Sequence, residues 1–246
     1  DTANTVEVTG TDSGTATGTG GFSNINGSVT GGSSTDDFDL NSGTLTGAIV
    51  GGGGTNSLTL DDVANAVAVT TPDNGTANGL GGGFSEIDTI TGGTAADDFT
   101  FIAGSLVGAS VSGINGAGGN DSVTVDADNN PVTQTITGAA SGDITVTGSS
   151  TLTYASVESR TITNMPAGSW SGVVAASDGD EPDGAGAEDS FEILRSGTDL
   201  QILIDSVVAE TKLFTEIDTI TINGTQADDD LLTVNIGSSQ VSEVVP

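Results

Sequence analysis

Acidic residues recur at the ends of glycine-rich turns, and they are the main candidates for chemistry in this sequence. Three such turns end in Asp36, Asp97 and Asp121, and Asn56 occupies the matching position of another turn. Carboxylates at these positions can bind hard cations, accept hydrogen bonds from turn amides, or act in pairs in glycoside hydrolysis. Histidine and cysteine are both absent, which excludes chemistry that needs an imidazole or a thiolate.

The composition is strongly acidic, with 34 Asp and Glu residues, three Lys and Arg residues and a formal charge of -31. Such a surface repels nucleic acid and anionic membranes, and cations are its natural complement. Because of this charge, we do not expect a nucleic-acid partner. No apolar run is long enough to span a bilayer, so we do not expect membrane insertion either.

A long segment of the chain is repeated, which predicts a structure built from stacked units. The sequence FSNINGSVTGGSSTDDF from Phe22 returns as FSEIDTITGGTAADDF from Phe84 and as FTEIDTITINGTQADDD from Phe214. A weaker copy begins at Tyr154, so the aromatic residues are spaced by 62, 70 and 60 residues. We therefore predict four long repeats, at about 14–74, 75–144, 145–208 and 209–240.

Apolar and polar residues alternate between the turns, which is the pattern of β-strands. The shorter spacing between turns predicts an all-β parallel β-solenoid, of the β-helix or β-roll kind, with coils of about 20 residues. Residues 1–246 would form one elongated domain. Ten alternating residues should form its core in two inward stacks: Phe38, Leu58, Phe99, Val123 and Phe191, then Leu40, Leu60, Phe101, Val125 and Ile193.

Four of the turns resemble the calcium-binding nonapeptide of RTX-type repeats, G-G-x-G-x-D-x-U-x, in which U is apolar. They are GGSSTDDFD from Gly31 and GGTAADDFT from Gly92, with Ser34 and Ala95 for the third glycine, GAGGNDSVT from Gly116, with Ala117 for the second glycine, and GGGGTNSLT from Gly51, with Asn56 for the aspartate. A weaker copy is GAGAEDSFE from Gly184. The resemblance implies calcium as a cofactor, held by Asp36, Asp97, Asp121 and Asp189. The alternative is that each aspartate only closes its turn by accepting backbone hydrogen bonds.

Residues 177–188 are predicted to form an acidic loop insertion, which is a weaker candidate for a metal site. Asp178, Asp180 and Asp183 would be its ligands. The loop resembles an EF-hand only superficially, because Pro182 stands where the third ligand is expected and Asp183 where the glycine belongs. The alternative is a solvated charge cluster.

The aromatic head followed by Thr-Gly-Gly and Asp-Asp resembles the β-strand repeat of large bacterial cell-surface and adhesin-like proteins. The resemblance implies a secreted, extracellular structural protein that assembles with copies of itself, head to tail or laterally, into a filament, sheath or S-layer-like coat. Cell-surface polysaccharide is a further expected partner. The alternatives are the stalk of a large adhesin and a carbohydrate-active β-helix enzyme.

We do not expect an enzyme, because no differentiated catalytic site can be recognised. The basic residues, Arg160, Arg195 and Lys212, are expected to be isolated surface charges, and a polysaccharide lyase would need such groups together. Self-assembly would instead use strands at the ends of the stack, supplied by the VEV run at Val6 and the VNI run at Val234.

Overall fold

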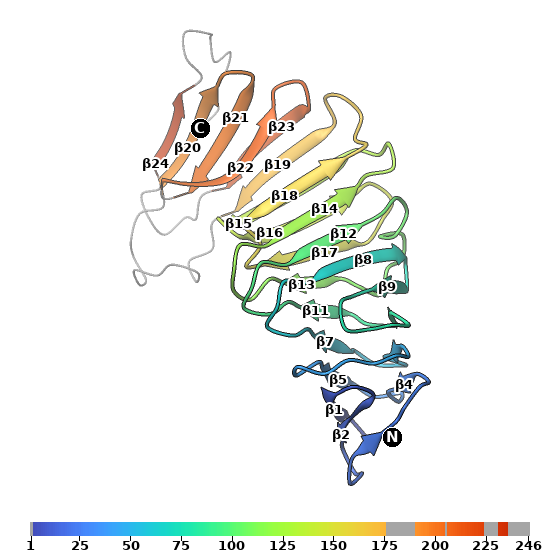
Figure 1. Cartoon of the computed structure of the whole chain (residues 1–246). Helices are drawn as coiled ribbons and strands as arrows, with labels where there is room; N and C mark the ends of the chain where they lie inside the picture. Colours follow the sequence, from blue (N-terminus) through green and yellow to red (C-terminus); the bar gives the residue numbers. More distant parts are fainter. Residues whose placement is uncertain (1, 176–189, 205, 224–230, 236–246) are drawn as a thin grey trace.

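The computed structural model describes residues 2–175, 190–204, 206–223 and 231–235, which form β-strands joined by turns (Figure 1). The strands make three sheets of twelve, eight and four members. The prediction of an all-β chain is confirmed. Within these ranges, no helix has the length and apolar character that crossing a membrane requires.

Neighbouring strands within each sheet are joined by hydrogen bonds, and their spatial order differs from their order along the chain. The twelve-stranded sheet contains, from one edge to the other, β23 (Ile217–Asn223), β19 (Trp170–Ala175), β15 (Val132–Gly138), β16 (Ser141–Val146), β17 (Thr151–Ala155), β13 (Gly113–Asn115), β11 (Thr89–Thr91), β7 (Ser57–Thr59), β5 (Asp36–Asp39), β1 (Asn4–Gly10), β2 (Ser13–Ala16) and β3 (Phe22–Ser23). The eight-stranded sheet contains β18 (Ser159–Thr163), β14 (Ser122–Asp126), β12 (Asp98–Phe101), β8 (Ala66–Thr71), β9 (Asn74–Thr76), β10 (Phe84–Ser85), β6 (Ile49–Val50) and β4 (Val29–Thr30). The four-stranded sheet contains β22 (Val207–Leu213), β21 (Asp199–Ile204), β20 (Ser190–Ser196) and β24 (Leu231–Asn235).

The chain combines two kinds of connection. Antiparallel meanders of three strands stay in one sheet: β1–β3, β8–β10, β15–β17 and β20–β22. Between the first three meanders, each successive strand lies in the other long sheet from the strand before it. Neighbours from successive coils within one sheet, such as β5 and β7 or β12 and β14, therefore pair in parallel. The aromatic residue of the repeat lies in the third strand of a meander at Phe22, Phe84 and Tyr154, and Phe214 directly follows β22.

The first two units each contain seven strands, β1–β7 and β8–β14. Because seven is an odd number, the second unit begins on the opposite sheet from the first. The meander β1–β3 therefore lies in the twelve-stranded sheet and β8–β10 in the eight-stranded sheet.

The predicted core is confirmed, since all ten of its residues are buried. The prediction that equivalent residues form single inward stacks is wrong. Phe38 pairs with Leu58 in the twelve-stranded sheet, whereas Phe99 pairs with Val123 in the eight-stranded sheet. The two pairs lie in different sheets because each unit has an odd number of strands. Side chains from all three sheets nevertheless contribute to one hydrophobic cluster.

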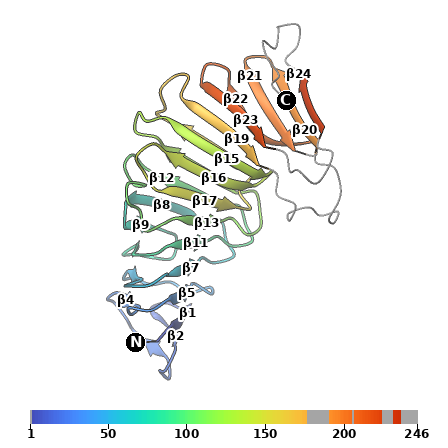
Figure 2. The same ribbon diagram turned by 180° about the vertical axis from the view of Figure 1, so that it is seen from behind.

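The stack widens from its N-terminal to its C-terminal end (Figures 1 and 2). Its N-terminal edge strands, β3 and β4, have only two residues each, whereas β23 and β24 at the other end have seven and five. Val6 lies in β1, which is flanked by β5 and β2, so the prediction that its run forms an end strand is wrong. Val234 lies in β24, an edge strand of the four-stranded sheet, as predicted.

Candidate functional site

The three acidic turn residues in the described part of the chain lie in two different corners of the stack. Asp36 is the first residue of β5 in the twelve-stranded sheet, and Asp97 and Asp121 directly precede β12 and β14 in the eight-stranded sheet. All three side chains are buried, with exposed fractions of 0%, 0% and 1%. The structure therefore brings Asp97 and Asp121 together and places Asp36 apart from them.

In the first corner, hydrogen bonds connect successive turns of the stack. The backbone N–H of Asn4 donates to Asp36 Oδ1 at 2.8 Å, and the N–H of Asp36 donates to Asn56 Oδ1 at 3.0 Å. The N–H of Asn56 then donates to Asp88 Oδ2 at 2.7 Å. We call this series of hydrogen bonds between successive turns a ladder. Asparagine and aspartate alternate along it, so each charged side chain has a neutral neighbour.

The second corner has the same geometry but a different charge pattern. The N–H of Asn65 donates to Asp97 Oδ1 at 2.8 Å, that of Asp97 to Asp121 Oδ1 at 2.7 Å, and that of Asp121 to Glu158 Oε2 at 2.7 Å. Three carboxylates therefore follow one another without an amide between them. Like charges at this spacing repel, and the repulsion is greatest for the central residue, Asp121.

The ladder spacing also explains the length of the coils. Partners are 20 or 24 residues apart where the chain only crosses between sheets. They are 32 or 37 residues apart where a meander intervenes. The predicted spacing of about 20 residues therefore holds only for the coils that contain no meander.

The second carboxylate oxygen distinguishes Asp121 from the other two aspartates. Oδ2 of Asp36 accepts a hydrogen bond from the N–H of Gly32 at 2.6 Å, and Oδ2 of Asp97 accepts one from Gly93 at 2.8 Å. The equivalent donor for Asp121 would be the N–H of Ala117, which instead donates to Asn115 Oδ1 at 2.9 Å. As a result, Oδ2 of Asp121 is buried without a hydrogen-bond partner in the described structure.

The pKa values of these carboxyl groups move in opposite directions. Burial alone would raise the pKa of Asp36, but its hydrogen bonds from Gly32 and Asn4 outweigh burial and lower it. Burial raises the pKa of Asp121, and the charges of Asp97, Glu158 and Asp98 add to the rise against one backbone hydrogen bond. The ionised form of Asp36 is thus stabilised by the hydrogen bonds of its turn, whereas the ionised form of Asp121 is destabilised by burial and by its acidic neighbours.

Several residues of these corners were not predicted from the sequence. Asp88 and Glu158 accept ladder hydrogen bonds, and each is the fourth residue after the aromatic head of its repeat, Phe84 or Tyr154. The residue two positions before each acid has a positive φ, 54° at Glu86 and 50° at Ser156. The recurrence of an acid at this place in FSEID and YASVE was the signal that could have identified the ladder.

The described residues contain no group of three or more acidic side chains placed to hold a metal ion. Calcium binding by Asp36, Asp97 and Asp121 stays a prediction. The other predicted ligands, Asp178, Asp180, Asp183 and Asp189, lie outside the described residues, as does the predicted loop at 177–188.

A second polar site lies in the core near the C-terminal end, where Arg160 occupies an inward position of β18. It is the register partner of Val123, which pairs in turn with Phe99. Only 4% of its side chain is exposed. Because an unpaired charge in a protein core is costly, this guanidinium requires partners.

Glu210 of β22 is the shared partner of two buried cations. Its Oε2 lies 3.4 Å from Nε of Arg160, and its Oε1 lies 3.2 Å from Nζ of Lys212. The guanidinium also donates to the carbonyl oxygens of Ala139, Val157 and Ala209. The prediction of isolated surface charges is therefore wrong for Arg160 and Lys212, whereas Arg195 lies over the ring of Phe214 at 5.0 Å.

Gln134 of β15 extends this network to the opposite sheet. Its Nε2 donates to Glu210 Oε2 at 2.6 Å and to the hydroxyl of Tyr154 at 3.3 Å, and its Oε1 accepts from Trp170 Nε1 at 3.1 Å. The network therefore joins all three sheets through the core.

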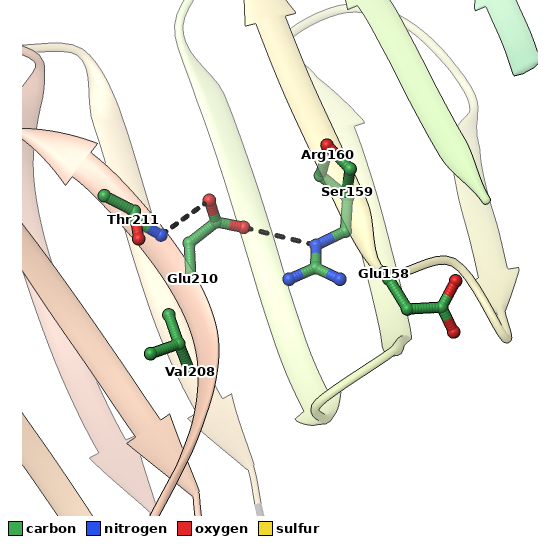
Figure 3. A pocket seen from close by; sticks show the side chains of 6 residues that line it. All are labelled: Glu158, Ser159, Arg160, Val208, Glu210 and Thr211. Carbon is green, nitrogen blue, oxygen red and sulfur yellow. Dashed lines mark hydrogen bonds and ion pairs between the residues drawn. The ribbon is translucent and has the colours of Figure 1, made fainter. Parts of the chain in front are cut away.

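A pocket of about 150 Å³ lies where the edges of β18 and β22 face each other without backbone pairing among the described strands. Figure 3 shows Arg160 reaching across this space to Glu210, while the carboxylate of Glu158 points away from the guanidinium. Its other lining residues are Ser159, Val208 and Thr211. The pocket is small and polar, and its central charges already neutralise each other.

The pH dependence of stability at Asp39 of β5 can test whether acidic side chains at the surface repel one another. Burial raises the pKa of Asp39, and the charges of Glu7, Asp61 and Asp62 raise it further. A raised pKa in the folded state means that this group favours folding below its unfolded pKa of about 3.9. The contribution is lost as the pH rises through the folded value.

We therefore expect Asp39→Asn to raise the melting temperature at pH 7 in low salt and to have little effect below about pH 3.9. The control is Asp37→Asn on the exposed face of the same strand, which removes the same charge. Equal shifts for the two variants across the pH range would contradict a specific role of Asp39.

Comparisons of the chain with protein-family models, with curated proteins and with solved structures find no match.

Proposed function

We propose that the stacked strands form a parallel β-solenoid and that the protein is an extracellular structural component of the bacterial cell surface, which assembles with copies of itself. The observation that best supports this proposal is the ladder from Asn4 through Asp36 and Asn56 to Asp88. Each turn uses its side chain to hold the backbone of the turn before it. A fold stabilised by contacts between successive turns can be lengthened by adding repeats.

The charge distribution supports a role in which cations control packing between molecules. Arg160 and Lys212 are buried against Glu210, so of the described cations only the exposed Arg195 offsets the acidic surface. Copies of a chain with a formal charge of -31 repel one another at low ionic strength. Salt, or divalent cations shared with neighbouring molecules and acidic cell-surface polysaccharide, would allow them to approach.

Calcium is the proposed stabilising ion, and the corner of Asp121 is where it fits best. The carboxylates of Asp36 and Asp97 already accept hydrogen bonds on both oxygens, whereas Oδ2 of Asp121 has no partner in the described structure. Main-chain carbonyl oxygens of the turn are suitable further ligands for a hard cation. Bound calcium would neutralise repulsion among the stacked acids.

The first experiment combines thermal unfolding with sedimentation velocity, in EDTA and then across millimolar Ca²⁺, with Mg²⁺ and matched ionic strength as controls. A rise in melting temperature specific to Ca²⁺ would support the ion site, as expected when a ligand binds only the folded state. Larger species would support self-assembly. A protein that remains monomeric at high concentration under every condition would contradict the assembly proposal and favour the stalk of an adhesin.

A further inference from the structure

The open edges of the sheets are protected to different degrees. Natural proteins protect strand edges by making them short, by charging them or by covering them. At the N-terminal end, β3 and β4 have two residues each, which is too short to hold a partner strand. The edges of β18 and β22 are bridged by Arg160, which donates to the carbonyl oxygen of Ala209.

β23 is neither short nor bridged in the described structure, and its one charged residue, Asp218, lies at a register shift near its start and not at its centre. It has seven residues and pairs on one side only, with β19. Its centre alternates exposed Thr219 and Thr221 with half-buried Ile220 and Ile222, which pack against the core. A long edge of β-branched residues with a half-covered apolar side is suited to pairing with another strand.

We propose that β23 pairs with β23 of a second copy of the chain, antiparallel and about a twofold axis at Thr221. The sequence complements itself in this register. Ile220 lies opposite Ile222 of the partner subunit on the core side, and Thr221 lies opposite Thr221 of the partner subunit on the outer side. The twelve-stranded sheets of the two copies then become one continuous sheet, and the half-buried isoleucines are covered.

This inference rests on the proposed self-assembly and specifies its geometry. A twofold contact uses the same surface on both copies and therefore closes as a dimer. The two-residue strands at the other end offer no equivalent edge, so the contact runs tail to tail and not head to tail. Because each copy carries a formal charge of -31, pairing should strengthen as salt screens the repulsion.

Cysteine crosslinking tests the register directly, because the 246-residue chain contains no cysteine. Residues opposite each other in an antiparallel pair have Cα atoms about 4.5 to 5.5 Å apart, which a disulfide can span. Thr221→Cys should give a covalent dimer under mild oxidation at about 1 M salt. The matched control, Thr30→Cys on β4, should remain monomeric on a non-reducing gel.

Sedimentation equilibrium of two lysine variants provides an independent readout. Ile220→Lys and Val29→Lys each place a charge at a half-buried position of an edge strand, at the tail and at the head respectively. We expect Ile220→Lys to weaken dimerisation at least tenfold and Val29→Lys to leave it unchanged. Circular dichroism melting confirms that each variant is folded before it is compared.

The possible failures can be distinguished. If the wild-type chain associates but only Val29→Lys weakens it, or if only the double variant Thr30→Cys/Thr221→Cys crosslinks, the tail-to-tail pairing is wrong and self-assembly stands. If the wild-type chain is monomeric at every salt concentration and Thr221→Cys does not crosslink, both the pairing and the assembly are wrong.

Discussion

Replacing Glu210 with glutamine is expected to destabilise the protein by about 3 to 5 kcal/mol, the largest effect predicted for a single side chain. Glu210 is the carboxylate shared by Arg160 and Lys212, and all three side chains are at most 7% exposed. The substitution keeps the shape of the side chain and removes its charge, so two buried cations lose their counterion. Urea unfolding monitored by circular dichroism measures the loss.

Glu192→Gln, a half-exposed position of β20, is the matched control and should change stability by less than about 0.5 kcal/mol. Replacing the three charges together, as Arg160→Met, Glu210→Met and Lys212→Met, should recover most of the stability, since a buried ion network often contributes little over apolar side chains. A small effect of Glu210→Gln alone would show that water reaches the network and screens it.

Replacing Asp121 with asparagine is expected to stabilise the protein by about 1 to 3 kcal/mol in EDTA at pH 7. Its Oδ2 is buried without a partner, and a Cβ placed on Gly116 would overlap both this oxygen and the carbonyl oxygen of Ser156. In the first corner, Nδ2 of Asn56 donates to the equivalent carbonyl oxygen, that of Glu86, at 3.1 Å. Asparagine at 121 can make the same bond and removes the repulsion from its acidic neighbours.

Asp97→Asn is the control with the opposite expected sign. Oδ2 of Asp97 accepts from the N–H of Gly93, and an amide group there leaves that donor unpaired, at a cost of about 1 to 3 kcal/mol. Thermal unfolding of both variants, with and without Ca²⁺, separates the two roles of the acids. If Asp121→Asn is destabilising and abolishes a Ca²⁺-dependent rise in melting temperature, Asp121 is an ion ligand and not a strained turn residue.

Alternation of apolar and polar residues was sufficient to predict that the chain is built of strands and to identify ten of its buried core residues. Phe38, Leu58, Phe99 and Val123 are buried because period two places them on the inner side of a strand, whichever sheet that strand joins. The sheet that a strand joins depends on how many strands lie between it and the equivalent strand of the preceding unit. The strands of two or three residues around β3, β4 and β6 carry too little sequence pattern for this number to be counted.

The buried network was missed because its members are far apart in the chain. Arg160 and Glu210 are separated by 50 residues, and Gln134 and Glu210 by 76. One signal was present for Arg160, which lies six residues after Tyr154, where Ile90 and Ile220 follow their own aromatic residues. A cation at a position that is otherwise apolar and inward-facing predicts a buried counterion, although the sequence does not say which acid provides it.

The seven-strand unit also determines how the molecule can lengthen during evolution. Duplicating one unit moves every following meander to the opposite face, so any surface displayed by the next segment is turned away from its original side. Duplicating two units restores the original side. Selection for a constant outer face would therefore favour gain and loss in pairs of units, and related chains should differ in length by even numbers of them.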